Sequence, residues 1–318
     1  MKIHQFKTLH IPDAAEMPVI QIESEQDYHD LLQSILETDY YGSDYFQRHS
    51  GYRRGKVKIR NLFISTVVDF LRPKSILELG CGRGDILAPF CQNPQLQVKG
   101  IEFSEGALAF APDAVKAVID LGPIETVLEA YQAQGLQFDT LLGFDIWEHL
   151  LPQNLAPTLA QLLSCCAPNS LFYFVIPAYG RDRVFGETFP LELAENREAL
   201  EQHQPFAYLL ADQLEPPIPA MGHLTWSSSR WWENFFAQAG LLREVELEKQ
   251  VHAHFDFIFQ ASLRSFFIFR MPTPEAQQRV ETVLARPFWG LRKWQKVLEF
   301  YGRMRKLQGS LGPEPSPR

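Results

Sequence analysis

The segment that decides the fold is ILELGCGRGD, residues 76–85. It opens with a short apolar run, which is typical of a buried strand, and continues into Gly80, Gly82 and Gly84 at alternate positions. Glycine has no side chain, so the backbone can turn tightly at these positions and a ligand can lie directly against it. The segment therefore predicts a buried strand that ends in a ligand-binding turn.

Similar apolar runs recur along the chain and alternate with segments of helical spacing. The predicted strands are 75–79, 98–102, 117–119, 138–144 and 171–177, and the predicted helices between them are 85–91, 105–111, 124–134 and 153–166. Strands that alternate with helices form a parallel sheet covered on both faces, and such sheets bind ligands at the carboxyl ends of their strands. The pattern therefore predicts a doubly wound α/β fold.

The chain on either side of this alternation completes the predicted architecture. Helices are predicted at 24–40, 57–71 and 227–241, strands at 243–250 and 264–271, and one or two basic helices at about 275–308. The regular pattern stops after Pro177, and a long connection at the mouth of an open sheet is usually a lid or a substrate-binding insertion. We therefore divide the chain into an N-terminal helical cap (1–56), a seven-stranded sheet domain (57–271, with the insertion at 178–229) and a basic helical tail (272–318).

The composition is that of a soluble globular enzyme. The 318 residues carry a net charge of −8, with 46% hydrophobic and 21% charged residues. This acidic balance argues against binding to DNA or to an anionic membrane, because both need a positive field. The sequence has no secretion signal and no apolar run of the roughly 20 residues that span a bilayer. We therefore expect no transmembrane segment. The four cysteines lack the spacing of a disulfide framework or a zinc site, so we expect reduced thiols and a cytoplasmic location.

Two classes of ligand compete for the glycine turn. A dinucleotide-binding turn follows the pattern GxGxxG, but Asp85 stands here in place of the third glycine. Glu78 precedes the first glycine by two positions, and its charge would repel a pyrophosphate. These residues disfavour a dehydrogenase.

Residues 78–84 (ELGCGRG) resemble motif I of the class I S-adenosylmethionine-dependent methyltransferases. The cofactor of that family carries a sulfonium and an amino group but no phosphate, so an acid beside the turn is acceptable. The resemblance implies the family's Rossmann-like sheet, and it places Glu78 below the methionine part of S-adenosyl-L-methionine. The residues that would admit this part of the cofactor are Gly80, Cys81, Gly82 and Gly84.

Two later strand ends supply further predicted cofactor contacts. Glu102 stands 20 residues beyond Gly82, and a carboxylate there can accept hydrogen bonds from both ribose hydroxyls. By resemblance to the family, Asp120 accepts from the adenine amino group and Leu121 offers its backbone amide, although Asp120 could instead cap a helix. Phe103 belongs to the same predicted pocket.

The segment GFDIWEHLLP (143–152) resembles the one after the fourth strand in many of these methyltransferases, including the ubiquinone-biosynthesis-type O-methyltransferases. His149 is the candidate general base, because histidine titrates near working pH; its alternative role is to open the next helix. Glu148 could orient His149 or line the cofactor pocket, and Asp145 is assigned to the cofactor. These three residues also match an acid-x-x-Glu-His cluster that binds a divalent metal in some relatives. Most relatives with Glu-His here need no metal and the other ligands are not identifiable, so we predict no metal site.

Four further positions are predicted to face the cofactor or the acceptor. His223 lies in MGHLTW at the expected mouth of the pocket, where a turn histidine bonded to backbone is the alternative. Tyr179 and Arg181 follow the fifth strand, where substrates dock; an arginine there would suit an anionic acceptor, and surface charge is the alternative. Arg53 lies in the basic stretch 48–60 (RHSGYRRGKVKIR), and the family's corresponding segment often closes over the cofactor's carboxylate.

The sequence thus predicts an S-adenosylmethionine-dependent methyltransferase that acts on a small-molecule or glycan-type acceptor, with O-methylation favoured. The alternatives are a non-catalytic cofactor-binding scaffold and an RNA-modifying methyltransferase. The intact glycine turn and Glu102 count against the scaffold, and the acidic body counts against RNA. Residues 271–318 carry nine basic and four acidic residues, a net charge of +5, and their apolar positions make this tail a candidate homodimer element.

Overall fold

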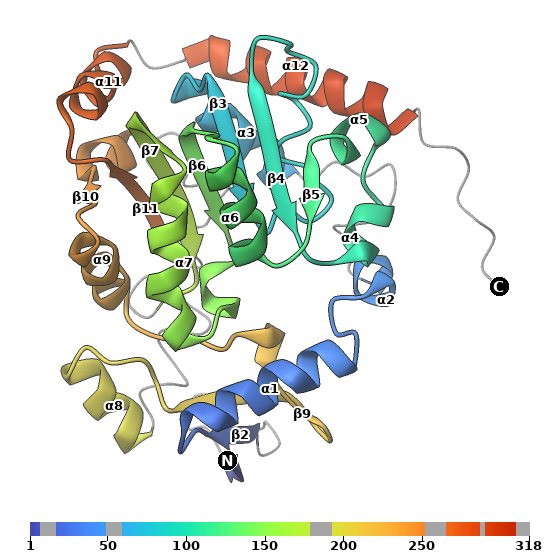
Figure 1. Ribbon diagram of the computed structural model, residues 1–318, viewed down its shortest axis with the longest axis vertical. Helices are drawn as coiled ribbons and strands as arrows, with labels where there is room; N and C mark the ends of the chain where they lie inside the picture. Colours follow the sequence, from blue (N-terminus) through green and yellow to red (C-terminus); the bar gives the residue numbers. More distant parts are fainter. Residues whose placement is uncertain (7–16, 49–58, 179–192, 252–264, 287–289, 310–318) are drawn as a thin grey trace.

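The computed structural model describes residues 1–6, 17–48, 59–178, 193–251, 265–286 and 290–309. Within these residues the chain forms a seven-stranded mixed sheet, the main sheet, and a four-stranded antiparallel sheet. The four-stranded sheet lies beyond the carboxyl ends of the parallel strands of the main sheet (Figure 1). The strand ends at which ligands bind therefore face the smaller sheet.

The main sheet has the strand order β10-β11-β7-β6-β3-β4-β5. Its parallel strands are β3 (Ser75–Leu79), β4 (Gln97–Glu102), β5 (Ile119–Leu121), β6 (Phe138–Phe144) and β7 (Cys166–Ile176), and its antiparallel strands are β10 (Leu242–Arg243) and β11 (Ser265–Arg270). The chain winds from β3 to β5 on one side and then returns to β6 on the other, so the winding reverses beside β3. The predicted doubly wound, mostly parallel α/β sheet is confirmed.

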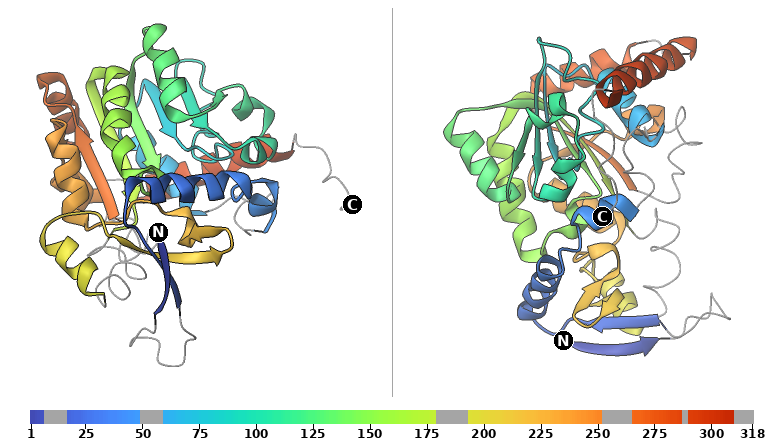
Figure 2. Two further views of the ribbon diagram at one scale, coloured as in Figure 1. Left: turned by 60° about the horizontal axis from the view of Figure 1, so that its bottom comes forward. Right: turned by 90° about the vertical axis from the view of Figure 1, so that its right-hand side faces the viewer.

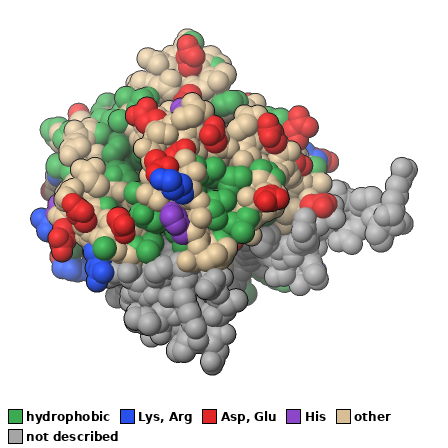
Figure 3. Space-filling model, turned by 90° about the horizontal axis from the view of Figure 1, so that it is seen from below, with side chains coloured by type: hydrophobic (Ala, Val, Ile, Leu, Met, Phe, Trp, Pro, Cys, Tyr) green, Lys and Arg blue, Asp and Glu red, His purple; other side chains and the backbone are tan. Residues whose placement is uncertain are grey.

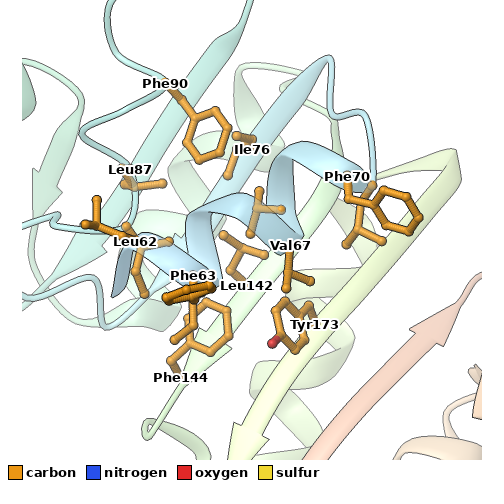
Figure 4. Packing of buried hydrophobic residues seen from close by; sticks show 14 of the residues in the cluster. Leu62, Phe63, Val67, Phe70, Ile76, Leu87, Phe90, Leu142, Phe144 and Tyr173 are labelled. Atoms are coloured by element: carbon orange, nitrogen blue, oxygen red, sulfur yellow. The ribbon is translucent and has the colours of Figure 1, made fainter. Parts of the chain in front are cut away.

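Helices cover both faces of the main sheet, because neighbouring residues of a strand point to opposite faces. On β3, Ile76 belongs to one hydrophobic core and Leu77 to the other. On the first face, Val67 points towards Tyr173 of β7 (Figure 4). The first face carries α3 (Ile59–Phe70) and α12 (Gly290–Gly309), and the second carries α6 (Ile124–Ala133), α7 (Pro152–Ser164) and α9 (Ser229–Gln238).

The four-stranded sheet joins two parts of the chain that are far apart in the sequence. Its strands are β1 (Lys2–Phe6), β2 (Met17–Gln21), β8 (Tyr208–Leu214) and β9 (Pro217–Pro219). Val19 of β2 lies opposite Leu210 of β8, and Ile20 and Leu209 share a hydrophobic core with α1 (Glu25–Glu37). We call these four strands, α1 and α8 (Ala194–Glu201) the cap. Figure 2 shows its N-terminal strands beside the strands of the insertion.

The N-terminal segment, which was predicted to be helical, also contains strands. Two helices, α1 and α2 (Ser43–Arg48), are present, but β1 and β2 precede them. Local periodicity does not reveal these strands, because β2 pairs with a strand that follows some 190 residues later. The insertion supplies that partner.

Two other predicted elements are wrong. Residues 243–250 were expected to form a strand, but β10 ends at Arg243 and residues 245–251 are helical. Leu247 and Val251 lie four apart and are both buried, whereas Val245 is 44% exposed, which is the pattern of a helix face. Residues 85–91 form turns instead of a helix, because Pro89 has no N–H to continue a helical ladder.

The C-terminal helices pack on the body of the same chain. Arg279 of α11 (Pro274–Leu284) donates through its guanidinium to the main-chain oxygens of Leu71 and Asn169. The helix α12 buries Phe300 and Met304 in the first core, against α3. No helix among the described residues is both long and apolar enough to cross a membrane. All four cysteines are free thiols.

Candidate active site

The glycine turn after β3 has one side that packs and one side that is open. Gly80, Gly82 and Gly84 all have positive φ angles, of +59°, +56° and +72°, which favour glycine. A Cβ atom at Gly84 would lie 2.3 Å from Val115, and one at Gly80 would lie 2.6 Å from Ile146. A Cβ atom at Gly82 would meet nothing within 4 Å. Packing therefore explains two of the glycines, and the third leaves bare backbone against which a ligand can lie.

Glu102, at the end of β4, ties this turn to the neighbouring strand. Its Oε2 accepts from the main-chain N of Gly82 at 2.7 Å, and its Oε1 accepts from those of Phe103 and Ser104 at 3.0 and 2.9 Å. Burial raises the pKa of Glu102, and these three hydrogen bonds oppose that rise. Glu102 also lies opposite Leu121 in the register of β4 and β5.

Two apolar side chains stand exposed beside Glu102. Phe103 is 48% and Leu121 is 43% exposed, although both are large hydrophobic residues. They follow neighbouring strand ends, so the structure brings together three residues that the sequence assigned to the cofactor. An exposed apolar pair beside a carboxylate suits a flat ring attached to a sugar.

Glu78 and Cys81 lie beneath the turn and are buried. Burial raises the pKa of Glu78 well above its ordinary value, and the nearby carboxylates of Asp85 and Glu102 add to the rise. Its Oε2 has no hydrogen-bond partner within the described part of the chain, which is costly for a buried polar atom. Burial also raises the pKa of Cys81 well above its ordinary value, so this cysteine stays a neutral thiol.

Asp120 is held by two neighbours, Lys99 and Tyr131, that the sequence does not mark as site residues. Its Oδ2 accepts from Lys99 Nζ at 2.8 Å and from the hydroxyl of Tyr131. Lys99 also lies over the ring of Tyr131, with Nζ 5.7 Å from the centroid. The contact of Asp120 with an adenine amino group stays a prediction.

Asp145 follows β6 in a strained backbone conformation, with φ of +52°. Its Oδ2 is 3.0 Å from Nη2 of Arg60, which lies in the first turn of α3. Arg60 is the last residue of the basic stretch 48–60, and the structure places it at the carboxyl ends of the strands. The predicted contact of Arg53 with the cofactor stays a prediction.

Glu148, His149 and His223 come together from two segments of the chain. Glu148 and His149 lie on the short 3₁₀ helix η1 (Trp147–His149), and His223 follows a second one, η2 (Ala220–Gly222). Oε1 of the fully buried Glu148 is 3.9 Å from Nε2 of each histidine. The main-chain oxygen of Glu148 accepts from the main-chain N of Leu224 at 2.8 Å and of Thr225 at 2.9 Å. Backbone bonds therefore fix the insertion onto η1.

The surroundings of His149 keep its imidazole neutral. Burial lowers its pKa, while the hydrogen bond to the main-chain oxygen of Gly222 and the charge of Asp145 act in the opposite direction. A neutral imidazole can accept a proton, whereas an imidazolium cannot. The site can therefore supply a general base at neutral pH.

The same three side chains are the residues here that could hold a metal ion. The ligand atoms of Glu148, His149 and His223 all lie within 4.8 Å of one another. Asp145, which completes the acid-x-x-Glu-His spacing, is paired with Arg60 instead. The absence of a metal stays a prediction. The predicted site residues Arg53, Tyr179 and Arg181 lie outside the described residues.

Comparison with known proteins gives the family. A family model described as a methyltransferase domain matches residues 52–245, which is more than half of the chain. A search of curated proteins found no match.

Solved structures share the fold at low identity. An O-methyltransferase family protein from Burkholderia thailandensis is 13% identical, with a TM-score of 0.42; the alignment covers 67% of this chain and 55% of that one. The 1,6-didemethyltoxoflavin-N1-methyltransferase of the same organism is also 13% identical, with a TM-score of 0.47 and coverage of 81% and 97%. The chain thus spans about half the length of the first protein, and neither likeness carries an argument about the reaction. The match of the family model, over the segment that contains the glycine turn and Glu102, shows that the chain belongs to the methyltransferase-domain family.

Proposed function

We propose that this protein transfers a methyl group from S-adenosyl-L-methionine to the hydroxyl of a small-molecule or glycan-type acceptor. The observation that carries the proposal is the open backbone at Gly82, which lies beside a buried carboxylate and two exposed apolar side chains. A nucleoside with an attached amino acid needs this combination of surfaces. The methyltransferase family of the chain supports the same cofactor.

Each part of the cofactor has a candidate partner. The methionine part would lie against Gly82, and the ribose hydroxyls would donate to Glu102. Phe103 and Leu121 would flank the adenine ring. Glu78, whose Oε2 lacks a hydrogen-bond partner among the described residues, offers an acceptor to the amino group. These residues lie at or near the carboxyl ends of β3, β4 and β5, the part of the sheet that begins where its winding reverses.

The chemistry asked of the protein is alignment and proton removal. S-adenosyl-L-methionine, when bound, supplies a methyl carbon on a cationic sulfur. The acceptor oxygen forms a bond to that carbon, the carbon–sulfur bond breaks, and its electron pair stays on sulfur. His149 takes the hydroxyl proton on its imidazole. Glu148, with Oε1 3.9 Å from Nε2 of both histidines, stabilises the resulting positive charge.

The insertion is the proposed substrate lid. His223 enters the site from its C-terminal end, next to the histidine that acts as base. Seen from the side of the cap, acidic side chains are spread over the described surface (Figure 3). Such a surface suits a small acceptor better than a nucleic acid, whose backbone needs a positive field. The division of the chain at residues 56 and 271, the dimer through the tail and the cytoplasmic location stay proposals.

Calorimetric titration with S-adenosyl-L-methionine and with NAD tests the cofactor. We expect micromolar binding of the former and none of NAD. Glu102→Ala is expected to weaken binding about 10- to 100-fold, because two charge-assisted hydrogen bonds are lost. Glu105→Ala, an exposed acid three residues later, is the matched control. If the wild-type protein does not bind S-adenosyl-L-methionine, the proposed function is wrong.

A turnover screen with isotopically labelled methyl donor over metabolite and glycan extracts identifies the acceptor. Mass spectrometry of the product then shows whether oxygen or nitrogen carries the new methyl group. Parallel assays with EDTA test the metal prediction. Activity that persists in EDTA agrees with a metal-free base, whereas activity that Mg²⁺ or Mn²⁺ restores would assign an ion to Glu148, His149 and His223.

A further inference from the structure

Tyr41 lies between the cofactor surface and the candidate base. It stands in the turn between α1 and α2, and its hydroxyl is 2.9 Å from Nδ1 of His149 and 2.7 Å from the main-chain oxygen of Met221. Its ring is edge-on to those of His149 and Phe103, at centroid distances of 5.6 and 6.0 Å. The hydroxyl of Ser104 donates to the main-chain oxygen of Tyr41 at 2.7 Å. One residue of the N-terminal segment therefore contacts both halves of the site.

The positions of the hydrogens follow from counting donors and acceptors. Burial raises the pKa of Tyr41 well above its ordinary value, so its hydroxyl keeps a single hydrogen. The hydroxyl donates this hydrogen to the main-chain oxygen of Met221, which can only accept. The main-chain oxygen of Gly222, 3.1 Å from Nδ1 of His149, can also only accept. Nδ1 thus faces two acceptors and carries a hydrogen, and in the neutral ring Nε2 is the bare nitrogen.

The turn at residues 221–222 is built for this approach. Met221 and Gly222 have φ angles of +54° and +71°. A Cβ atom at Gly222 would lie 1.9 Å from the hydroxyl oxygen of Tyr41, so only glycine permits the contact. Asp212 of β8 holds the turn from the other side, because its Oδ2 accepts from Met221 N and from the hydroxyl of Tyr40, each at 2.7 Å. Left-handed backbone persists only where its surroundings hold it. Here they hold the main-chain oxygen of Gly222, which faces Nδ1, and that of Met221, which accepts from Tyr41.

We propose that Tyr41 is a positioning residue for methyl transfer: its hydroxyl keeps the hydrogen of His149 on Nδ1 and so leaves Nε2 to take the acceptor's proton. The proposal rests on the proposed role of His149 as general base. Tyr41 lies outside the segment 52–245 that matches the family model, so the N-terminal segment completes a site whose other parts lie within that segment. Without Tyr41, the imidazole can present an N–H where the reaction needs a lone pair.

Long-range ¹H–¹⁵N correlation spectra of the ¹⁵N-labelled protein with bound S-adenosyl-L-methionine test the tautomer directly. The signals of His149 are assigned by their loss in His149→Asn. We expect the Nδ1–H tautomer in the wild-type protein and a mixture of tautomers in Tyr41→Phe. The same variant is expected to lower kcat about fivefold while the cofactor Kd stays unchanged, because this change corresponds to the roughly 1 kcal/mol that a hydrogen bond of this kind contributes.

Tyr208→Phe is the matched control, because it removes a hydroxyl of the cap that contacts Glu195 and not His149. It is expected to leave the tautomer unchanged. An Nε2–H tautomer in the wild-type protein would overturn the proposal without any variant. So would a Tyr41→Phe protein that keeps either the wild-type tautomer or the wild-type kcat. If no acceptor is methylated by the wild-type protein, the general-base function fails, but the spectra still show whether Tyr41 sets the tautomer.

Discussion

The main sheet and the cap differ in which parts of the chain they join. In the main sheet β3 pairs with β4, the next strand along the chain, and helices pack on both faces of the sheet. In the cap, two local strand pairs, β1 with β2 and β8 with β9, are joined into one sheet where Val19 pairs with Leu210. The proposed cofactor surface lies on the main sheet, while His149 is surrounded by residues from both sides. Cofactor binding is thus expected to depend on one region and turnover on both.

The largest expected effect comes from the proposed base, His149. His149→Asn is expected to lower kcat about 10²- to 10⁴-fold, which is the range that general-base catalysis contributes. The cofactor Kd is expected to stay within about twofold of the wild-type value, because the main-sheet surface is untouched. His29→Asn, an exposed histidine on α1, is the control. If the His149→Asn protein turned over normally, His149 would not be the general base.

Core truncations compare the two regions as folding units. Ile20→Ala in the cap and Ile76→Ala in the main sheet each remove a fully buried side chain and are expected to cost about 2–5 kcal/mol. Hydrogen exchange followed by mass spectrometry distinguishes the two. We expect Ile20→Ala to expose mainly the amides of β1, β2 and β8, and Ile76→Ala to weaken protection throughout. Equal loss of protection everywhere in both variants would mean that the cap and the main sheet unfold as one unit.

Paired glycine substitutions test the cofactor surface with little change in the fold. Gly82→Ala and Gly135→Ala each place a Cβ atom at a positive φ angle, with nothing of the protein within 4 Å. Both are expected to cost about 1 kcal/mol of stability. Only Gly82→Ala is expected to raise the Kd for S-adenosyl-L-methionine, by about tenfold or more, because its methyl group occupies the space of the ligand. Equal affinities in the two variants would place the cofactor elsewhere.

The smallest effect is a pH dependence of stability. Burial raises the pKa of Glu78, so this carboxyl keeps its proton in the folded protein at pH values at which it has lost it in the unfolded chain. This stabilisation is complete below the unfolded pKa and is lost as the pH rises through the folded pKa. Glu78→Gln has no such proton to lose. In urea titrations, the unfolding free energy of Glu78→Gln should therefore exceed that of the wild type by more at pH 8 than at pH 5. A difference that does not change with pH would contradict the raised pKa of Glu78.

The same contrast explains what the sequence could predict. The strands at 75–79 and 138–144 are found with their predicted bounds, because each is a short run buried on both faces. The glycine turn and Glu102 follow such strands, so their proximity could also be predicted. The strands of the cap were not predicted, because no local pattern identifies them and the pairing of β2 with β8 joins residues some 190 positions apart.

The candidate site divides in the same way. Glu148 and His149 were predicted as neighbours and His223 as a separate candidate, and the structure brings the three together. Tyr41, Arg60 and Lys99 were not predicted as site residues. A tyrosine or a basic residue becomes informative only when the fold shows which carboxylate or imidazole it meets. Spacing along one chain does not contain that information.

The two hydrogen bonds from the main chain at Leu224 and Thr225 to the carbonyl of Glu148 have a consequence for protein engineering. These two bonds between the insertion and η1 use peptide groups alone, so they do not depend on which side chains the insertion carries; the hydroxyl of Thr225 adds one side-chain bond, to the main-chain oxygen of Leu150. A chimaera that exchanges the outer surface of the cap for that of a relative would keep this alignment. The acceptor preference could then be changed without altering the residues of the main sheet that are proposed to bind the methyl donor.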